Sequence, residues 1–185
     1  PRQERFQRMN EVAKLVANRV LAAHQKVRFQ KDITLAMEQT LLTLKNRQPT
    51  AKEIAFAKAV LSDQPPNPLP RLAEAYAHRT LALANGPREE EIVLQALRLG
   101  EVGITSIPCE VLCEIGLTLK AKSPLPQATF TIELANGHNG YLPTPRQHAL
   151  GGYETWMGTC TLEILASEKI KKTLLKMLEK VADSD

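Results

Sequence analysis

Four side chains in the stretch 94–157 have the chemistry of metal ligands or acid–base groups: Glu110, His138, Tyr141 and Tyr153. A carboxylate and an imidazole are good zinc ligands, and a phenol becomes one where a metal or a positive field lowers its high pKa. Each also has an ordinary structural role, such as Glu110 at a helix start or Tyr153 packed on Trp156. On residue type alone, they mark a site of unknown chemistry.

The pattern of apolar residues around these side chains predicts a β-sheet. Alternating apolar positions over 92–99 and 102–107 are typical of two strands, and Gly100-Glu101 between them suits the tight turn of a hairpin. A third strand is predicted over 129–134. We expect an α/β or α+β domain with a mixed sheet of four or more strands, flanked by helices.

Glu110 and Tyr141 are predicted to follow strand ends. Pro108 ends the strand ladder, and the residues after it predict a helix that begins near Glu110. Tyr141 closes the run from Asn136 onward, whose two glycines let the chain bend. Sheet proteins with covering helices usually place ligands beyond the carboxyl ends of strands. We therefore expect Glu110 and Tyr141 to face one cavity, bordered by Tyr153.

Helices are predicted before and after this sheet in the sequence, and the terminal helices are expected to cover it. Apolar side chains recur at alternating spacings of three and four over 2–23, which is typical of a packing face. Thr50-Ala51-Lys52-Glu53 has the sequence of a capping box at the start of a helix, and a further helix is predicted over 69–84. The closing helix is predicted over 161–182. Its apolar stripe, expected to cover the sheet, consists of Ile170, Leu174, Met177, Leu178 and Val181.

The segment before residue 87 contains two less regular stretches. Residues 38–44 combine threonines with partial alternation and are interpreted as a strand. Four prolines between 63 and 70 predict a stiff surface connector. The chain is thus interpreted as a single domain over 1–185, mainly helical over 1–86, with the sheet over 87–157 and a closing helix over 158–185.

Composition limits the classes of partner. The net charge of +4 is mild, and basic residues alternate with acids without an aromatic stripe, so a nucleic-acid partner is not expected. No stretch approaches the roughly 18 apolar residues of a membrane span. Cys109 and Cys113 have helical spacing without a second ligand pair nearby, so they are interpreted, with Cys160, as buried free thiols. Because the chain opens on Pro1, it is interpreted as part of a longer protein.

The central stretch resembles the C-terminal part of the catalytic domain of the neutral, non-lysosomal ceramidase family. Members are zinc-dependent amidases that hydrolyse the N-acyl bond of ceramide. The resemblance rests on four segments, in order: LRLGEVGITSIPCEV, IGLTLKAKSPLP, LANGHNGYLPTP and GGYETW. It implies a larger zinc-hydrolase domain with zinc as cofactor, Glu110 and Tyr141 as zinc ligands, and Tyr153 as a catalytic residue that binds the scissile amide oxygen.

The sequence also departs from the family pattern. Cys109 stands where glycine is common, His138 where an aromatic residue is usual, and Gly140 where a histidine occurs. The resemblance places two further zinc histidines and the catalytic serine region in segments that precede this chain, and neither His24 nor His78 has the motif to replace them. It therefore implies a fragment that is inactive alone, completed by the N-terminal part of the same protein and acting on an N-acyl amide or ceramide-like lipid. The alternative is a non-catalytic binding or structural protein that retains the scaffold. Compartment and oligomeric state have no sequence signal.

Overall fold

The structure is a computed structural model that describes residues 5–125 and 128–184. Internal contacts divide the chain into two compact units, Pro1–Ile33 and Thr34–Asp185, whereas the sequence was interpreted as one domain over 1–185. Unit 1 contains the helix α1 (Gln7–His24). The predicted start of this helix at residues 2–4 lies outside the described residues. Every described residue of unit 1 is exposed, so the packing face predicted over 2–23 is not buried.

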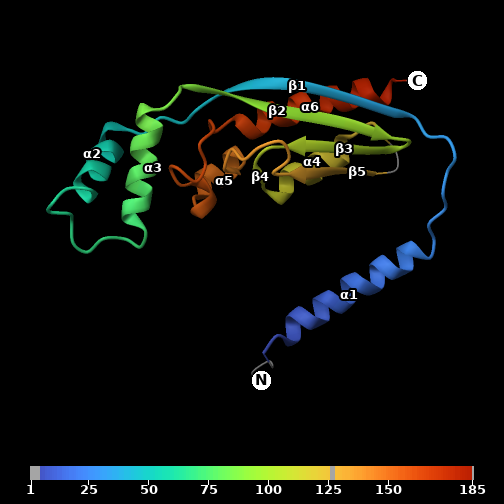
Figure 1. Ribbon diagram of the computed structural model, residues 1–185, viewed down its shortest axis with the longest axis horizontal. Coiled ribbons are helices and arrows are strands. Elements are labelled where there is room, and N and C mark those ends of the chain that lie inside the picture. Colours follow the sequence, from blue (N-terminus) through green and yellow to red (C-terminus); the bar gives the residue numbers. More distant parts are fainter. Residues whose placement is uncertain (1–4, 126–127, 185) are drawn as a thin grey trace. The chain divides into compact units, whose positions relative to one another are not determined.

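Unit 2 is built on a four-stranded mixed sheet in the order β1-β2-β3-β5. The strands are β1 (Leu35–Lys45), β2 (Glu89–Leu99), β3 (Val102–Ile107) and β5 (Ala128–Glu133). β1 to β3 are antiparallel neighbours, and β5 pairs parallel to β3 (Figure 1). This confirms the mixed α/β fold, the strand predicted over 38–44 and the hairpin at Gly100, whose φ of 61° suits glycine in a tight turn.

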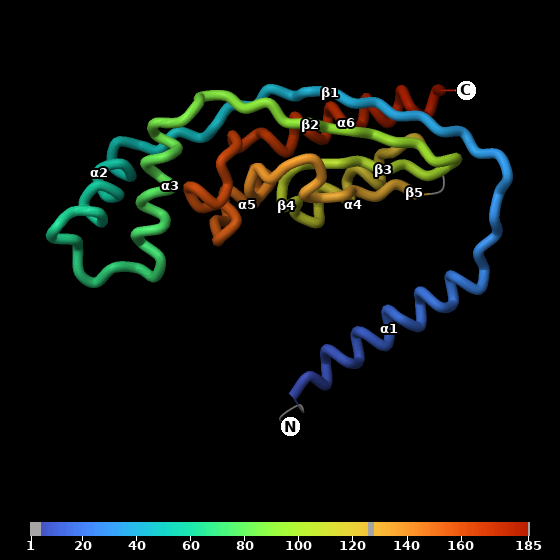
Figure 2. Tube along the Cα trace, viewed as in Figure 1, coloured from blue at the N-terminus to red at the C-terminus, as the bar shows by residue number. Residues whose placement is uncertain are grey.

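Two helices cover one face of this sheet. The closing helix α6 (Ala166–Ala182) packs on β1 and β2, and α4 (Cys113–Lys122) packs on β5 and on α6 (Figure 2). Each residue of the predicted stripe on α6 is buried: Ile170, Leu174, Met177, Leu178 and Val181. The opposite face of the sheet carries exposed apolar side chains: Leu35, Met37, Leu41, Leu99, Phe130 and Ile132.

A helix pair forms a second, smaller core in unit 2. α2 (Ala51–Val60) begins with the predicted capping box, in which Thr50 Oγ1 accepts from Glu53 N and the Glu53 carboxylate accepts from Thr50 N. α3 (Ala73–Asn85) lies against it, and Ala57, Val60 and Ala77 are buried between them. The connecting residues 61–72 contain the prolines. Among the described residues, no helix has both the length and the hydropathy to cross a bilayer.

Three predicted helix starts are corrected by the structure: two because long-range backbone pairing competes with the helix, and one because a left-handed residue precedes it. Glu110 lies in a short strand, β4 (Glu110–Val111), and α4 begins only at Cys113. α6 begins five residues later than predicted, because residues 161–163 bond to the end of β1 through Arg47 N to Thr161 O and Glu163 N to Lys45 O. α3 begins at Ala73 rather than 69, after Leu72 takes a left-handed φ of 62°.

Candidate active site

Parallel pairing brings the two leading candidates together. β3 and β5 are parallel neighbours, so both carboxyl ends lie at the same edge of the sheet. Beyond that edge, β4 pairs parallel with β6 (Tyr141–Leu142), and Glu110 is the register partner of Tyr141. Glu110 N donates to Gly140 O at 2.9 Å, which holds the two segments side by side. Glu110 is thus fixed by a strand pair and does not cap a helix.

The turn before Tyr141 depends on a glycine. Gly140 has a φ of 71°, and a Cβ there would lie 2.5 Å from Thr159 O. That same carbonyl accepts from Tyr141 N at 3.0 Å. The close approach of Gly140 to Thr159 therefore fixes the position of Tyr141 beside residues 157–161. It leaves no space for a side chain at position 140.

All four sequence-predicted side chains line one cavity of about 570 Å³. The remaining lining residues come from α3, β2 and the loops around them: Asn46, Arg79, Leu83, Pro87, Glu90, Asn139, Gly140, Gly158, Thr159 and Thr161. His138 Nε2 lies 3.4 Å from Glu110 Oε1, and the His138 side chain is 66% exposed against 33% for Glu110. The histidine thus covers the carboxylate from the solvent side.

A row of aromatic rings leads away from this cavity. Tyr141 meets Tyr153 edge to face, with ring centroids 5.7 Å apart, and Tyr153 meets Trp156 in the same way at 5.5 Å. Trp156 then contacts Tyr76 of α3 at 5.4 Å. Edge-to-face pairs favour particular ring orientations, and they add stabilisation to that from burial of apolar surface. Tyr153, in the 3₁₀ turn η1 (Tyr153–Thr155), is therefore held by contacts on both sides.

Both site tyrosines keep their protons more firmly than free phenols. A hydrogen-bonding interaction with Glu110, burial and the negative charges of Glu110 and Glu154 raise the pKa of Tyr141 to about 12. A hydrogen-bonding interaction with Tyr76 is the largest cause that raises the pKa of Tyr153 above its usual value. At neutral pH, the cavity therefore presents two neutral phenols that can donate hydrogen bonds.

A second cavity, of about 670 Å³, lies between α2 and α3. Its walls are mostly apolar and include Phe56, Ala57, Ala73, Ala77 and Met157. Tyr76 and Trp156 of the aromatic row also line it. The row of edge-to-face rings thus runs from Tyr141 and Tyr153 in the first cavity to Trp156 and Tyr76 in the second.

Three side chains of the first cavity carry donor atoms of the kinds that zinc accepts. Glu110 offers a carboxylate, Tyr141 a phenol beside it, and His138 an imidazole within 3.4 Å of that carboxylate. A catalytic zinc ordinarily takes three protein ligands and a water. Over residues 5–125 and 128–184, no group of three or more His, Cys, Asp or Glu is placed to hold a metal. Cys109 and Cys160 are buried free thiols, as predicted, whereas the prediction of a buried thiol is wrong for Cys113, which lies at the exposed start of α4.

Sequence reasoning missed the residues that hold the site from a distance. Arg47 Nη1 donates to Thr155 O at 2.8 Å and to Cys160 O at 3.2 Å, which ties the loop that carries Tyr153 to the end of β1. Asn139 Nδ2 donates to Glu90 at 2.7 Å. Gly158 approaches Arg79 so closely that a Cβ would lie 2.6 Å from the Arg79 Cβ. Of these residues, Gly158 is the one whose type could have indicated such a contact from the sequence.

The chain is similar in fold to part of a neutral ceramidase. The crystal structure of neutral ceramidase from Pseudomonas aeruginosa matches 78% of this chain with a TM-score of 0.53 and 15% identity. A structure of ceramidase complexed with C2 matches 50% of this chain, and 15% of its own, with a TM-score of 0.46 and 15% identity.

These comparisons show a ceramidase-like fold and nothing finer. No family model matches the chain, and no curated protein matches it significantly. The chain spans only 28% of the length of the Pseudomonas aeruginosa protein. At 15% identity, the likeness concerns the path of the backbone, so the chemistry must be argued from the residues of this chain.

Proposed function

We propose that this chain supplies part of the active site of a zinc-dependent amide hydrolase, with Glu110 and Tyr141 as zinc ligands and Tyr153 as the donor to the scissile carbonyl oxygen. The observation that carries the proposal is the parallel pairing of Glu110 with Tyr141 at the mouth of one cavity that Tyr153 also lines. The ceramidase-like fold supports it. In the bound state, zinc would polarise the carbonyl and activate a water.

The raised pKa of Tyr141 makes metal binding pH-dependent. Without a metal, the phenol keeps its proton because Glu110 lies beside it. Ligation requires the phenolate, so zinc would have to displace that proton, and the affinity would rise with pH. The Glu110 carboxylate would offer the first oxygen. The pair would thus form a carboxylate–phenol half-site in which the phenol keeps its proton when no cation is bound.

Tyr153 fits the role of a hydrogen-bond donor. Its raised pKa keeps the hydroxyl protonated at neutral pH, and 46% of the residue is exposed toward solvent and the cavity. A phenol held by edge-to-face contacts with Tyr141 and Trp156 loses little freedom when it donates. Preorganised donors of this kind stabilise the negative charge that develops on a carbonyl oxygen during acyl transfer.

The apolar cavity supports a substrate with a hydrocarbon chain. A cavity of about 670 Å³ with apolar walls accommodates an aliphatic chain, and Trp156 and Tyr76 link it to the polar site. An amide held at Glu110 and Tyr153 could therefore extend its acyl chain along the rings toward α2 and α3. The substrate class is an N-acyl amide, with a ceramide-like lipid as the first candidate.

The remaining ligands are proposed to come from other parts of the whole protein. Two donors are too few for a firm catalytic zinc, and His138 would bring the count to three only by turning from solvent. The apolar open face of the sheet supports the same conclusion, since a further layer would bury it. We expect the chain alone to bind zinc weakly and to lack amidase activity.

Zinc titration of the full chain tests the half-site directly. As Zn²⁺ is added at mildly alkaline pH, we expect proton release and a tyrosinate absorbance band. Tyr141→Phe and Glu110→Gln should abolish the band, whereas Tyr76→Phe, a tyrosine outside the donor set, should keep it. An equal band in Tyr141→Phe, or no zinc binding at any pH at which the chain stays folded, would remove the zinc assignment.

A non-catalytic binding protein is the second candidate. It is favoured by the small number of zinc donors within the described residues. Assays on the whole protein distinguish the two candidates. An amidase would lose turnover of an N-acyl amide when zinc is removed by a chelator or when Tyr153 is replaced in Tyr153→Phe. A binding protein shows no turnover and keeps its affinity for the amide after chelation.

A further inference from the structure

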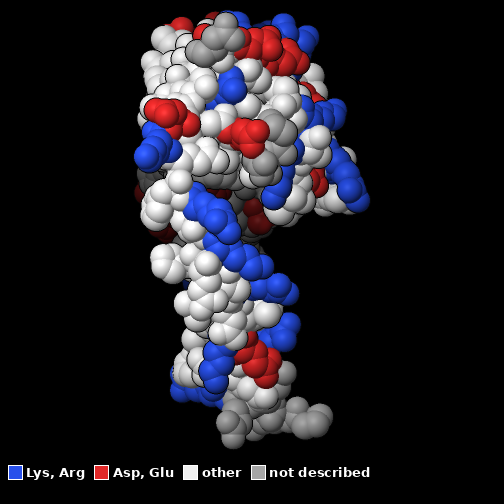
Figure 3. All heavy atoms as spheres, turned by 90° about the vertical axis from the view of Figure 1, so that its right-hand side faces the viewer, with Lys and Arg blue, Asp and Glu red and all other residues white. Residues whose placement is uncertain are grey.

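The excess positive charge of this chain is confined to unit 1. Residues 1–33 contain eight Lys and Arg against three Asp and Glu, a net charge of +5, whereas residues 34–185 contain sixteen against seventeen, a net charge of −1. The mild overall charge of +4 therefore conceals a strongly basic segment. Lys and Arg side chains gather along this segment in the lower part of Figure 3.

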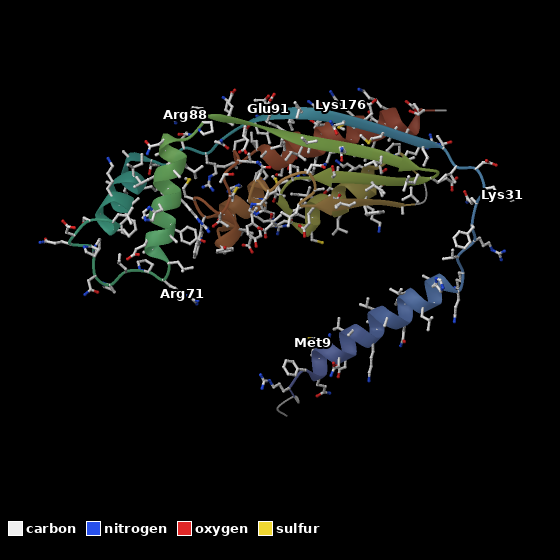
Figure 4. All side chains as sticks on the ribbon, in the orientation of Figure 1. Met9, Lys31, Arg71, Arg88, Glu91 and Lys176 are labelled. Carbon is white, nitrogen blue, oxygen red and sulfur yellow. The ribbon has the colours of Figure 1, made fainter. Side chains whose placement is uncertain are left out.

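The same segment carries an apolar stripe with no cover in its own unit. At about 100° per residue, one face of α1 collects six of its ten apolar side chains, whereas Leu15 and Leu21 lie off this face. The six are Met9, Val12, Ala13, Val16, Val20 and Ala23. Arg8 and Arg19 lie at one border of this stripe, and Asn18 lies on the opposite face. All of these residues are exposed, and the Met9 side chain projects from the helix in Figure 4.

From this pairing of charge and apolar surface, we propose that α1 binds the surface of an anionic lipid bilayer. The helix has 18 residues, about 27 Å, and four charged side chains, so it would lie in the plane of the interface rather than cross it. Its apolar stripe would enter the acyl boundary. The basic residues would contact the anionic headgroups, and their long side chains can reach them from the edge of the stripe.

The charge and the apolar stripe of α1 together favour an anionic bilayer over two other kinds of partner. A second copy of the chain would bring a further segment of +5 against the first, and α1 offers a single acid, Glu11, to offset it. A nucleic acid would satisfy the positive charge but would leave the apolar stripe in water. An anionic bilayer satisfies both features of the same helix. This inference does not depend on zinc or on amide hydrolysis, so it stands or fails separately from the proposed function.

Vesicle binding by the full chain tests the proposal, with a chelator present to exclude metal effects. The probes are vesicles of phosphatidylcholine alone and of phosphatidylcholine with phosphatidylserine. Val16→Glu places an acid in the apolar stripe, and Asn18→Glu places the same charge on the opposite face of α1. We expect binding only to the vesicles that contain phosphatidylserine. Asn18→Glu should weaken it by about fivefold, through charge alone. Val16→Glu should weaken it by at least a further tenfold, since it also disrupts the apolar contact.

Three results would overturn the proposal. The first is no binding to the anionic vesicles, and the second is equal loss in the two variants, which would show that only charge matters. The third is a lower unfolding midpoint for Val16→Glu than for Asn18→Glu in the absence of lipid, because that would show the stripe packed on protein. Amide exchange along 7–24 without vesicles provides an independent check: fast exchange that slows on anionic vesicles supports the proposal, and protection without them contradicts it.

Discussion

Replacing Gly140 with alanine tests the contact that positions Tyr141. Gly140 has a φ of 71°, a backbone conformation that costs an L-residue roughly 1–2 kcal/mol. The new Cβ would lie 2.5 Å from Thr159 O, so the two segments must separate. That movement lengthens the 3.0 Å hydrogen bond from Tyr141 N to Thr159 O, worth about 1 kcal/mol. We expect Gly140→Ala to lower the free energy of unfolding by about 2–3 kcal/mol.

Gly116 provides a matched control of opposite sign. It lies inside α4, and a Cβ there would meet its nearest atoms, in Thr131, at 3.7 Å, an ordinary contact. Gly116→Ala should therefore stabilise the fold by about 0.5–1 kcal/mol through helix propensity. Urea unfolding followed by circular dichroism measures both variants. Unfolding of Gly140→Ala at the wild-type midpoint, while Gly116→Ala behaves as expected, would show that Gly140 does not approach Thr159 closely. The position of Tyr141 inferred from that contact would then also be wrong.

The burial and charge of particular residues predict the results of three further experiments. Leu174→Ala in the fully buried stripe of α6 should cost about 2–5 kcal/mol in chemical denaturation, whereas Lys176→Ala on the exposed face should cost less than about 0.5 kcal/mol. A thiol reagent should label Cys113 rapidly and the buried Cys109 and Cys160 only on unfolding, because burial raises the pKa of these two thiols. Fast labelling of all three would contradict the burial of Cys109 and Cys160. Because the folded-state pKa of Tyr141 lies above its ordinary value of 10, its contribution to stability is complete below pH 10 and is lost as pH rises toward about 12. Glu110→Gln should lower that pKa toward 10 in a tyrosinate titration, and an unchanged titration would show that the two groups do not interact.

Local patterns predicted most of unit 2. The strand alternation, the turn at Gly100, the capping box at Thr50 and the stripe on α6 each depend on residues within a few positions of one another, and each is confirmed. Propensity and periodicity act over this range, so a single sequence carries their signal.

Long-range pairing accounts for what the sequence did not predict. Glu110 follows a proline and precedes an apolar helix, so it fits a helix start. It becomes a strand residue because Tyr141, thirty-one positions later, pairs with it. Tyr76 and Arg79 enter the site region only because α3 folds against the 156–159 segment. No local pattern records such contacts, although the glycine at 158 marks the closest of them.

The environment of Glu110 gives the strongest physical argument for a cation. Within the described residues, its carboxylate forms no ion pair with Lys or Arg, and Nε2 of the exposed His138 ring lies 3.4 Å from Glu110 Oε1. A phenol with a pKa of about 12 occupies the neighbouring strand. This carboxylate, two-thirds shielded from water, has the Tyr141 phenol and the His138 ring as hydrogen-bonding partners, and a cation would add further compensation for the hydration it has lost. A divalent cation would provide that compensation and would also reverse the effect of Glu110 on Tyr141, since the same field would favour the phenolate. In the proposed zinc site, Glu110 and Tyr141 would therefore bind one cation together.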